Sequence, residues 1–270
     1  MNSSKFFITL LSILFSSFTA GQDIIRFKEA PEGVKITEIA VTNNRYGDGI
    51  RRGTTSLSIT INRADADILS VATERCELKS IIDNNGARLD EESKQDAMGT
   101  AIAWYALGVS RDGRSAGVKA QVTSLPSVGA TSLKATGKIM LITGKSRATV
   151  KDAGLDISEG TKIKAGDIII SIENVEKSED NKTTAITLQY DDIPNRIIDV
   201  EFFDEKGTKI EKISAEYSVI AIKPDGKGSA KILYNLNGNV SKADVRITFW
   251  EETAETPVSF DCKTGLGLTK

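Results

Sequence analysis

The chain has 270 residues, of which 35 are Lys or Arg and 37 are Asp or Glu, so that its formal net charge is −2. A nearly balanced charge provides no basic field for nucleic acid or for an anionic membrane. The sequence contains no histidine, which excludes Ser-His-Asp and Cys-His catalysis as well as imidazole zinc sites. The length suits two modules, each large enough to bury its own core.

Residues 1–21 have the pattern of a secretion signal. Lys5 supplies a short positive region, residues 6–15 form an apolar stretch well below the ~20 residues that a membrane span requires, and small residues end the segment at Gly21. The alternative is a retained membrane anchor. We expect cleavage near Gly21, a mature chain that begins at Gln22 and is secreted or periplasmic, and no membrane span after removal of the signal.

Short apolar runs between turn residues predict a first β module over residues 22–157. Residues 54–61 alternate most clearly between apolar and polar side chains. The stretch 64–74 fits a short helix, while its residues 68–71 fit a strand equally well, so we expect a loop. Residues 89–99 are polar and predict a solvent-exposed excursion. The expected strands are residues 24–27, 34–41, 76–83, 87–89, 102–109, 116–123, 133–142 and 148–151, in addition to 54–61.

A second module is expected over residues 158–270. Residues 157–166 are polar and rich in turn formers, and the apolar pattern restarts beyond them, so we place a short linker there. The linker has no Pro-rich or Gly/Ser-rich run, which favours a restricted orientation of the modules. The expected strands are residues 167–175, 185–190, 197–203, 208–213, 217–222, 230–236, 245–250 and 258–262.

Two stretches of the chain repeat the same turn. Residues 81–89 and 202–210 each place two large apolar residues before an Asp-x-x-Gly turn, which ends at Gly86 or at Gly207. Gly adopts positive φ without steric cost, and Asp caps such a turn. Three further matches follow in the same order and predict an internal duplication, the alternative being a chance likeness of two β modules. They pair residues 54–61 with 183–190, 111–114 with 224–227, and Leu133 and Ala135 with Val245 and Ile247.

The strand pattern predicts an all-β fold of two tandem immunoglobulin-like antiparallel β-sandwich domains. Each module has about seven short strands, with turn signals about every ten residues and almost no helical periodicity. Small barrels are the alternative fold.

The mature chain resembles a loosely defined group of secreted bacterial immunoglobulin-like proteins. The resemblance rests on the secretion signal, the tandem β modules, the hairpin EFFDEKG at residues 201–207 and the ending PVSFDCKTGLGL at residues 257–268. These motifs are turn and strand signatures. The resemblance therefore implies the sandwich fold and carries over no functional residue.

The sequence contains two cysteines, Cys76 and Cys262, one in each expected module. An oxidising compartment allows them to form a disulfide between the modules. The alternative is two separate thiols in strands, since free Cys is often buried. Neither belongs to a CxxC redox pair.

We expect a non-enzymatic interaction or structural module outside the cytoplasm, with an unknown protein or glycan as partner and with no cofactor, no metal and no nucleic acid. Binding is then expected on loops or on an exposed strand edge. The first alternative is a glycan-binding module, which requires exposed aromatic side chains, although Trp104, Tyr105, Tyr217 and Trp250 all lie in expected strands. The second alternative is a hydrolase that uses two carboxylates across a cleft.

Overall fold

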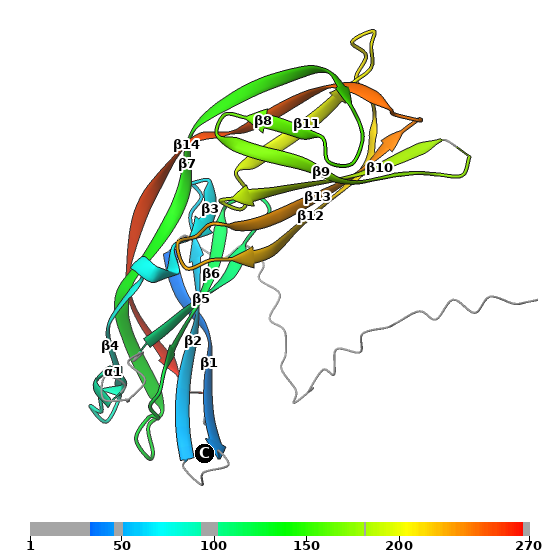
Figure 1. Cartoon of the computed structure of the whole chain (residues 1–270). Coiled ribbons are helices and arrows are strands. Elements are labelled where there is room, and N and C mark those ends of the chain that lie inside the picture. The colour runs from blue at the N-terminus through cyan, green and yellow to red at the C-terminus, as the bar shows by residue number, and fades with distance from the viewer. Residues whose placement is uncertain (1–32, 46–50, 93–101, 181, 267–270) are drawn as a thin grey trace, which may run out of the picture. The chain divides into compact units, whose positions relative to one another are not determined.

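The structure is a computed structural model, and it describes residues 33–45, 51–92, 102–180 and 182–266 (Figure 1). The expected signal at residues 1–21 and the expected strand at 24–27 lie outside these residues. The described chain is all-β, as predicted. Its elements are β1 (Gly33–Arg45), β2 (Arg51–Asn62), β3 (Ile68–Val71), a 3-10 turn (Thr73–Arg75), β4 (Glu77–Asp83), α1 (Leu89–Glu92), β5 (Ile102–Val109), β6 (Ser115–Val122), β7 (Ser132–Asp156), β8 (Lys162–Ala165), β9 (Ile168–Lys177), β10 (Thr183–Asp192), β11 (Ile197–Phe203), β12 (Lys212–Ile222), β13 (Gly228–Asn237) and β14 (Lys242–Gly265).

All strand pairs between these elements are antiparallel. One sheet has the order β1-β2-β6-β5, and a second has the order β12-β13-β10-β9-β8. The third sheet has the order β11-β14-β7-β3, and β4 also pairs with β7. Strands β7 and β14 pair with each other from Lys242 opposite Asp156 to Gly265 opposite Ser132. The third sheet therefore faces the first sheet with one end and the second sheet with the other.

Alternating side chains build two hydrophobic cores. In β6, β10 and β13 every second residue is buried, which is the pattern of a strand with one face on a core. The first core includes Leu57, Val118 and Leu141. The second core includes Leu188 and Phe202, and the Phe202 ring meets the Tyr234 ring edge-on at 5.6 Å between centroids. Both cores are thus formed between facing antiparallel sheets.

The predicted repeat matches the strand topology. The order β1-β2-β6-β5 has its counterpart in β9-β10-β13-β12, and β4 pairs with β7 as β11 pairs with β14. Gly86 and Gly207 both have positive φ, 88° and 77°. Asp83 and Asp204 each accept hydrogen bonds from the backbone N–H groups two and four residues later. The equivalent turns are therefore built in the same way.

Two pairs of expected strands are single long strands in the structure. The sequence predicts separate strands at 133–142 and 148–151, but β7 runs through both over 25 residues. Likewise β14 runs through 245–250 and 258–262 over 24 residues, with its register shifted between Trp250 and Glu252. The prediction of separate strands was wrong, because the polar residues between them pair with each other across the two strands.

Other local predictions also differ from the structure. The expected linker contains β8, whose Ile163 and Ala165 are buried in the second core. Residues 68–71 are a strand and not a loop, and all four are buried. Leu89 and Asp90, expected in solvent, are each 1% exposed, and Asp90 accepts a hydrogen bond from the Ile81 N–H. The short strands expected at 87–89 and 208–213 each form one isolated bridge with the preceding strand.

Each core contains residues from both sides of the expected boundary near residue 157. Phe260 is buried in the first core, and Val258 and Cys262 pack against it. In the second core, Val150 and Leu155 pack against the buried cluster. The division into residues 22–157 and 158–270 stays a prediction from the repeat, and the packing of β7 and β14 extends across it.

Candidate functional site

The second sandwich has a groove along one side, between β11 and β12. These are edge strands of facing sheets, so each has one unpaired backbone edge among the described strands. The groove has a volume of about 310 Å³. It is lined by Ile197, Ile198 and Asp199 of β11, Lys212, Ala215, Glu216 and Tyr217 of β12, Ile232 and Tyr234 of β13, Trp250 of β14, Arg147 of β7, Asn195, and the segments 67–69 and 111–113.

The floor of the groove is apolar. Ile197 and Ile232 belong to the second core, and Tyr217 packs against it. The Tyr217 hydroxyl oxygen accepts a hydrogen bond from the Asn195 N–H at 2.8 Å, which positions the ring. Asn195 has a φ of 62°, the left-handed conformation that Asn tolerates better than most residues. Burial raises the pKa of the Tyr217 hydroxyl and of the Tyr234 hydroxyl, so both phenols are neutral at physiological pH.

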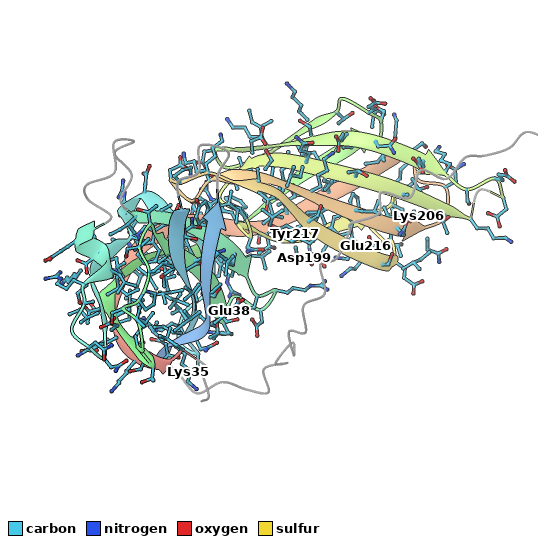
Figure 2. All side chains as sticks on the ribbon, turned by 90° about the horizontal axis from the view of Figure 1, so that it is seen from below. Lys35, Glu38, Asp199, Lys206, Glu216 and Tyr217 are labelled. Carbon is cyan, nitrogen blue, oxygen red and sulfur yellow. The ribbon has the colours of Figure 1, made fainter. Side chains whose placement is uncertain are left out.

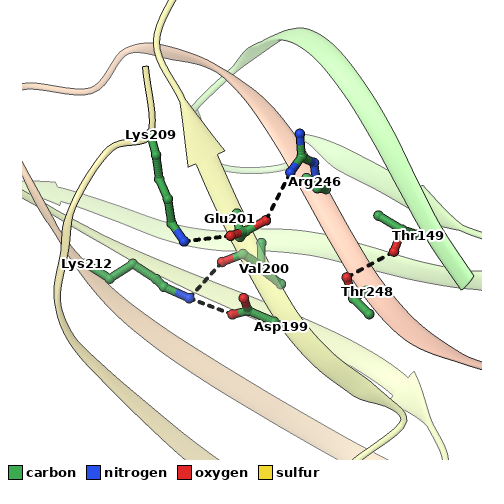
Figure 3. Close-up of polar contacts among 8 residues, drawn as sticks. All are labelled: Thr149, Asp199, Val200, Glu201, Lys209, Lys212, Arg246 and Thr248. Carbon is green, nitrogen blue, oxygen red and sulfur yellow. Dashed lines mark hydrogen bonds and ion pairs between the residues drawn. The ribbon is translucent and has the colours of Figure 1, made fainter. Parts of the chain in front are cut away.

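Ion pairs close one end of the groove. Lys212 reaches from β12 to β11, where its Nζ lies 2.6 Å from Asp199 Oδ1 and 3.2 Å from the Val200 carbonyl oxygen (Figure 3). Beside it, Lys209 Nζ lies 2.6 Å from Glu201 Oε1, and Arg246 contacts the other oxygen of Glu201 at 3.5 Å. Lys209 and Lys212 cover the β11 edge from residue 199 to 201, while Arg246 comes from the paired strand β14. The β11 edge of the groove is therefore free of ion pairs only at Ile197 and Ile198.

Two charged side chains at the groove have neither an ion pair nor a hydrogen bond with any described residue. They are Arg111, in the turn between β5 and β6, and Glu216 in β12. A third residue without an ion pair, Asp112, accepts hydrogen bonds from the Ser110 hydroxyl and from the Arg114 N–H. By contrast, Arg147 lies 3.5 Å from Asp67. Figure 2 shows Glu216, Tyr217 and Asp199 in the same region of the structure, and all three line the groove. The open groove thus offers one unpaired positive and one unpaired negative charge.

No contact in the described structure joins two carboxylates of the groove as a catalytic acid and base. Asp199 is bound by Lys212, and Asp67 by Arg147. The pKa of Asp112 is lowered, first by the Ser110 hydroxyl and then by the Arg114 N–H, whereas a general acid needs a raised pKa. The arrangement is suited to binding, because it combines unpaired backbone edges, an apolar floor and separated charges.

A buried arginine fixes the strand behind the groove. Arg196 precedes β11 and donates hydrogen bonds from Nε to the Trp250 carbonyl at 2.8 Å and from Nη2 to the Glu251 carbonyl at 3.1 Å. It also pairs with Asp167 at 2.8 Å and with Asp192. These contacts meet β14 where its register shifts. Arg196 is therefore a structural residue that holds Trp250 in place.

The aromatic residues considered for a glycan site are mostly covered. Trp250 is 7% exposed, with the Arg147 guanidinium 4.4 Å from the ring centroid and Gly144 against the indole. Trp104 is half-buried against the first core, and Tyr217 is half-buried in the groove. Tyr105 is 49% exposed on β5. The structure does not bring these four side chains together on one exposed face.

Cys76 and Cys262 are both free thiols in the structure. Cys76 directly precedes β4, and Cys262 lies in β14, opposite Ala135 of β7. Strands β4 and β14 pair with opposite edges of β7, so about two strand spacings, or roughly 10 Å, separate them. A disulfide requires Cα atoms within about 7 Å. Pairing would require the sheet to open, and the geometry matches the alternative of two separate thiols.

Among the described residues no three His, Cys, Asp or Glu side chains are placed to hold a metal ion. No helix in the described ranges combines the length and the apolar character needed to cross a membrane. No family model matches the chain, and no curated protein matches it.

Sequence reasoning predicted a binding edge in general but not this groove. Its residues come from segments between Asp67 and Trp250, and no local pattern marks which strands become edges of a sheet. The charged residue Asp199 inside the expected strand 197–203 is the available signal, since charges are common on edge strands.

Proposed function

We propose that the chain is a non-enzymatic interaction or structural module that acts outside the cytoplasm and consists of two tandem immunoglobulin-like β-sandwiches. The two matching strand orders support two sandwiches of related topology. The apolar segment that ends at Gly21 supports export, and the resemblance to secreted bacterial immunoglobulin-like proteins agrees with both. In this proposal the protein binds its partner through the groove between β11 and β12.

The groove carries the proposal because it is flanked by the edge strand β12 and by the part of the β11 edge at Ile197 and Ile198 that no described residue covers. An unpaired edge offers backbone N–H and C=O groups to an added strand, and pockets for alternate side chains provide selectivity. Here Ile197, Ile232 and Tyr217 form the apolar surface for such side chains. The occupant is therefore an extended polypeptide segment with apolar residues at every second position.

The charges at the groove define this segment further. Arg111 lies at the β5–β6 turn and Glu216 on β12, and neither has an ion pair within the described chain. A segment with an acidic residue toward Arg111 and a basic residue toward Glu216 leaves no groove charge unpaired. Such complementarity gives selectivity and faster association more than it gives affinity.

Glycan binding is the weaker candidate, because a sugar platform needs an exposed aromatic face. Trp250 is almost fully covered, and Trp104 is half-buried against the first core. A carboxylate-based hydrolase is weaker still, because Asp199 and Asp67 are engaged by cations. Neither alternative is favoured by a contact in the groove.

Site-specific photocrosslinking tests the proposal. A benzophenone side chain replaces Ile198, which lines the groove and is 40% exposed, in the chain that begins at Gln22. The protein is incubated with cell-envelope extract, irradiated, and the crosslinked peptides are identified by mass spectrometry. We expect one partner, attached through an extended segment with the stated charges.

Matched variants make this experiment specific for the groove. The double change Arg111→Glu and Glu216→Lys reverses both unpaired charges and should abolish the crosslink, while Lys206→Glu, in the exposed turn after β11, should leave it unchanged. A benzophenone at Val128, which is fully exposed, controls for random capture. Two results would refute the proposal. The first is equal crosslinking from residues 128 and 198, and the second is binding of the chain to a polysaccharide that the two charge reversals weaken.

A further inference from the structure

Strand β5 differs in charge from the other exposed edge strands. It forms one edge of the sheet β1-β2-β6-β5 and has the sequence IAWYALGV, without a charged residue. Two of its large side chains point into solvent, since Tyr105 is 49% and Leu107 57% exposed. An exposed apolar edge strand is a site for pairing with another strand.

The remaining edges among the described strands are protected by charge or by burial. The opposite edge of the same sheet, β1, carries exposed Lys35 and Glu38 (Figure 2). Charged residues also lie in the edge strands β4, β8, β11 and β12, and the four residues of β3 are all buried. Charged side chains are a common protection against edge-to-edge association. Among the described edge strands, β5 alone has neither charged residues nor complete burial, which indicates that another strand covers this edge.

The first core is also incompletely covered along β5. The core-facing residues of the neighbouring strand β6, such as Val118, are fully buried. Their neighbours on β5, including Ile102, Trp104 and Ala106, are only half-buried, although they pack against the same core. Another strand beside β5 would remove this apolar surface from water, which stabilises the pair by about 25 cal/mol per Å².

We infer that a second copy of this chain covers the edge, so that two β5 strands pair antiparallel across a two-fold axis. Such an interface is self-complementary, and every residue of one copy faces a residue of the same strand in the other. Like charges that face each other destabilise a strand pair. The uncharged β5 strand avoids this penalty, whereas two-fold pairing of β1 or β12 brings Lys35 or Glu216 near its own copy. The inference is independent of the groove between β11 and β12.

The interface is small, so the dimer is expected to be weak. Eight residues of one edge bury less than the about 1,600 Å² of a standard interface, which is typical of weak, transient association. The bulge between Ala106 and Gly108 limits regular pairing to the first five residues of the strand. Such a weak pairing becomes effective where the chain is concentrated or held on a surface.

Sedimentation velocity over a concentration series, with reductant present, tests this inference on the chain that begins at Gln22. Tyr105→Lys places a charge near the middle of β5 and should weaken dimerisation at least about tenfold. The matched control is Val41→Lys, which makes the same kind of change at a 46% exposed position on the opposite edge and should leave dimerisation unchanged. Circular dichroism verifies that both variants are folded.

Hydrogen–deuterium exchange at low and high protein concentration identifies the interface directly. Amides of residues 102–106 should exchange more slowly at high concentration, and amides of β1 should not. A chain that stays monomeric at several hundred micromolar, a dimer that withstands Tyr105→Lys, or a dimer that Val41→Lys disrupts equally would each overturn the inference.

Discussion

Replacing Arg196 by Met should destabilise the protein more than any replacement of an exposed arginine. Met retains most of the apolar stem but removes the guanidinium, which contacts Asp192, Asp167 and the Trp250 and Glu251 carbonyls. The Arg196 side chain is 8% exposed and that of Asp192 is 13% exposed, while that of Asp167 is 74% exposed. The variant therefore leaves one largely buried carboxylate and two strand carbonyls without their donor.

The expected loss follows from these contacts. Removing one partner of a buried ion pair costs about 3–5 kcal/mol, because the remaining charge stays desolvated. Asp167 adds little, since water solvates it once the pair is broken. With an m-value of about 2–3 kcal/mol/M in urea, a loss of this size lowers the unfolding midpoint by about 1–2.5 M.

Urea unfolding followed by tryptophan fluorescence measures this loss, and Trp250 reports directly on the Arg196 site. The control is Arg246→Met in β14, whose exposed contact with Glu201 at 3.5 Å is expected to contribute no more than about 1 kcal/mol. Equal midpoints for the two variants would refute the reasoning. Water would then have to satisfy the Trp250 and Glu251 carbonyls as well as Arg196 does.

Two further predictions concern single residues. Thiol titration of the unreduced, denatured chain should find two free thiols, because a strand of the sheet lies between Cys76 and Cys262; a count of zero contradicts the described register. Asp83→Asn should lower the free energy of unfolding by about 1.5–3 kcal/mol at pH 7. The buried Asp83 carboxylate accepts hydrogen bonds from two backbone N–H groups of its own turn and from both the N–H and the hydroxyl of Ser127. Asp204→Asn, in the exposed equivalent turn, should cost less. Burial raises the pKa of Asp83, but these hydrogen bonds outweigh it and hold the pKa below its ordinary value, so the contribution is present above about pH 4 and lost as the pH falls. Chemical unfolding at several pH values should show the variant converging on the wild type in acid, and a constant difference down to pH 2 would contradict this.

Local sequence patterns predicted the strands that pack against a single core. They failed for β7 and β14, each of which packs against both cores. Residues 102–109 and 197–203 were predicted with the bounds observed, because their alternation or apolar run is bordered by turn residues. Residues 143–147 and 251–257 lack such a pattern, because in these segments the strand passes from one core to the other. Leu89 and Asp90 lie in a polar stretch, and tertiary contacts explain their burial: Leu89 packs in the first core, and Asp90 accepts the Ile81 N–H. The groove depends on sheet order, which no local pattern contains.

The two halves that the repeat predicts share their last strands. Strand β7 begins in the first core with Leu133 and Leu141 and ends against the second core with Val150. Its counterpart β14 begins in the second core with Val245 and ends in the first core with Phe260. Each copy thus completes the other, as in a strand-swapped dimer joined into one chain.

Because of this exchange, neither sandwich is complete without the other half of the chain. The two halves differ in the segment that follows the Asp-x-x-Gly turn. In the first copy, Asp90 accepts the Ile81 N–H and Leu89 is buried beside β4, which closes that edge. At the equivalent place after the second turn, Glu211 interacts instead with Asn237 at the end of β13. The backbone carbonyl of Phe202, which is equivalent to Ile81, accepts a hydrogen bond from the Ile210 N–H, so the two halves are both covered at this position.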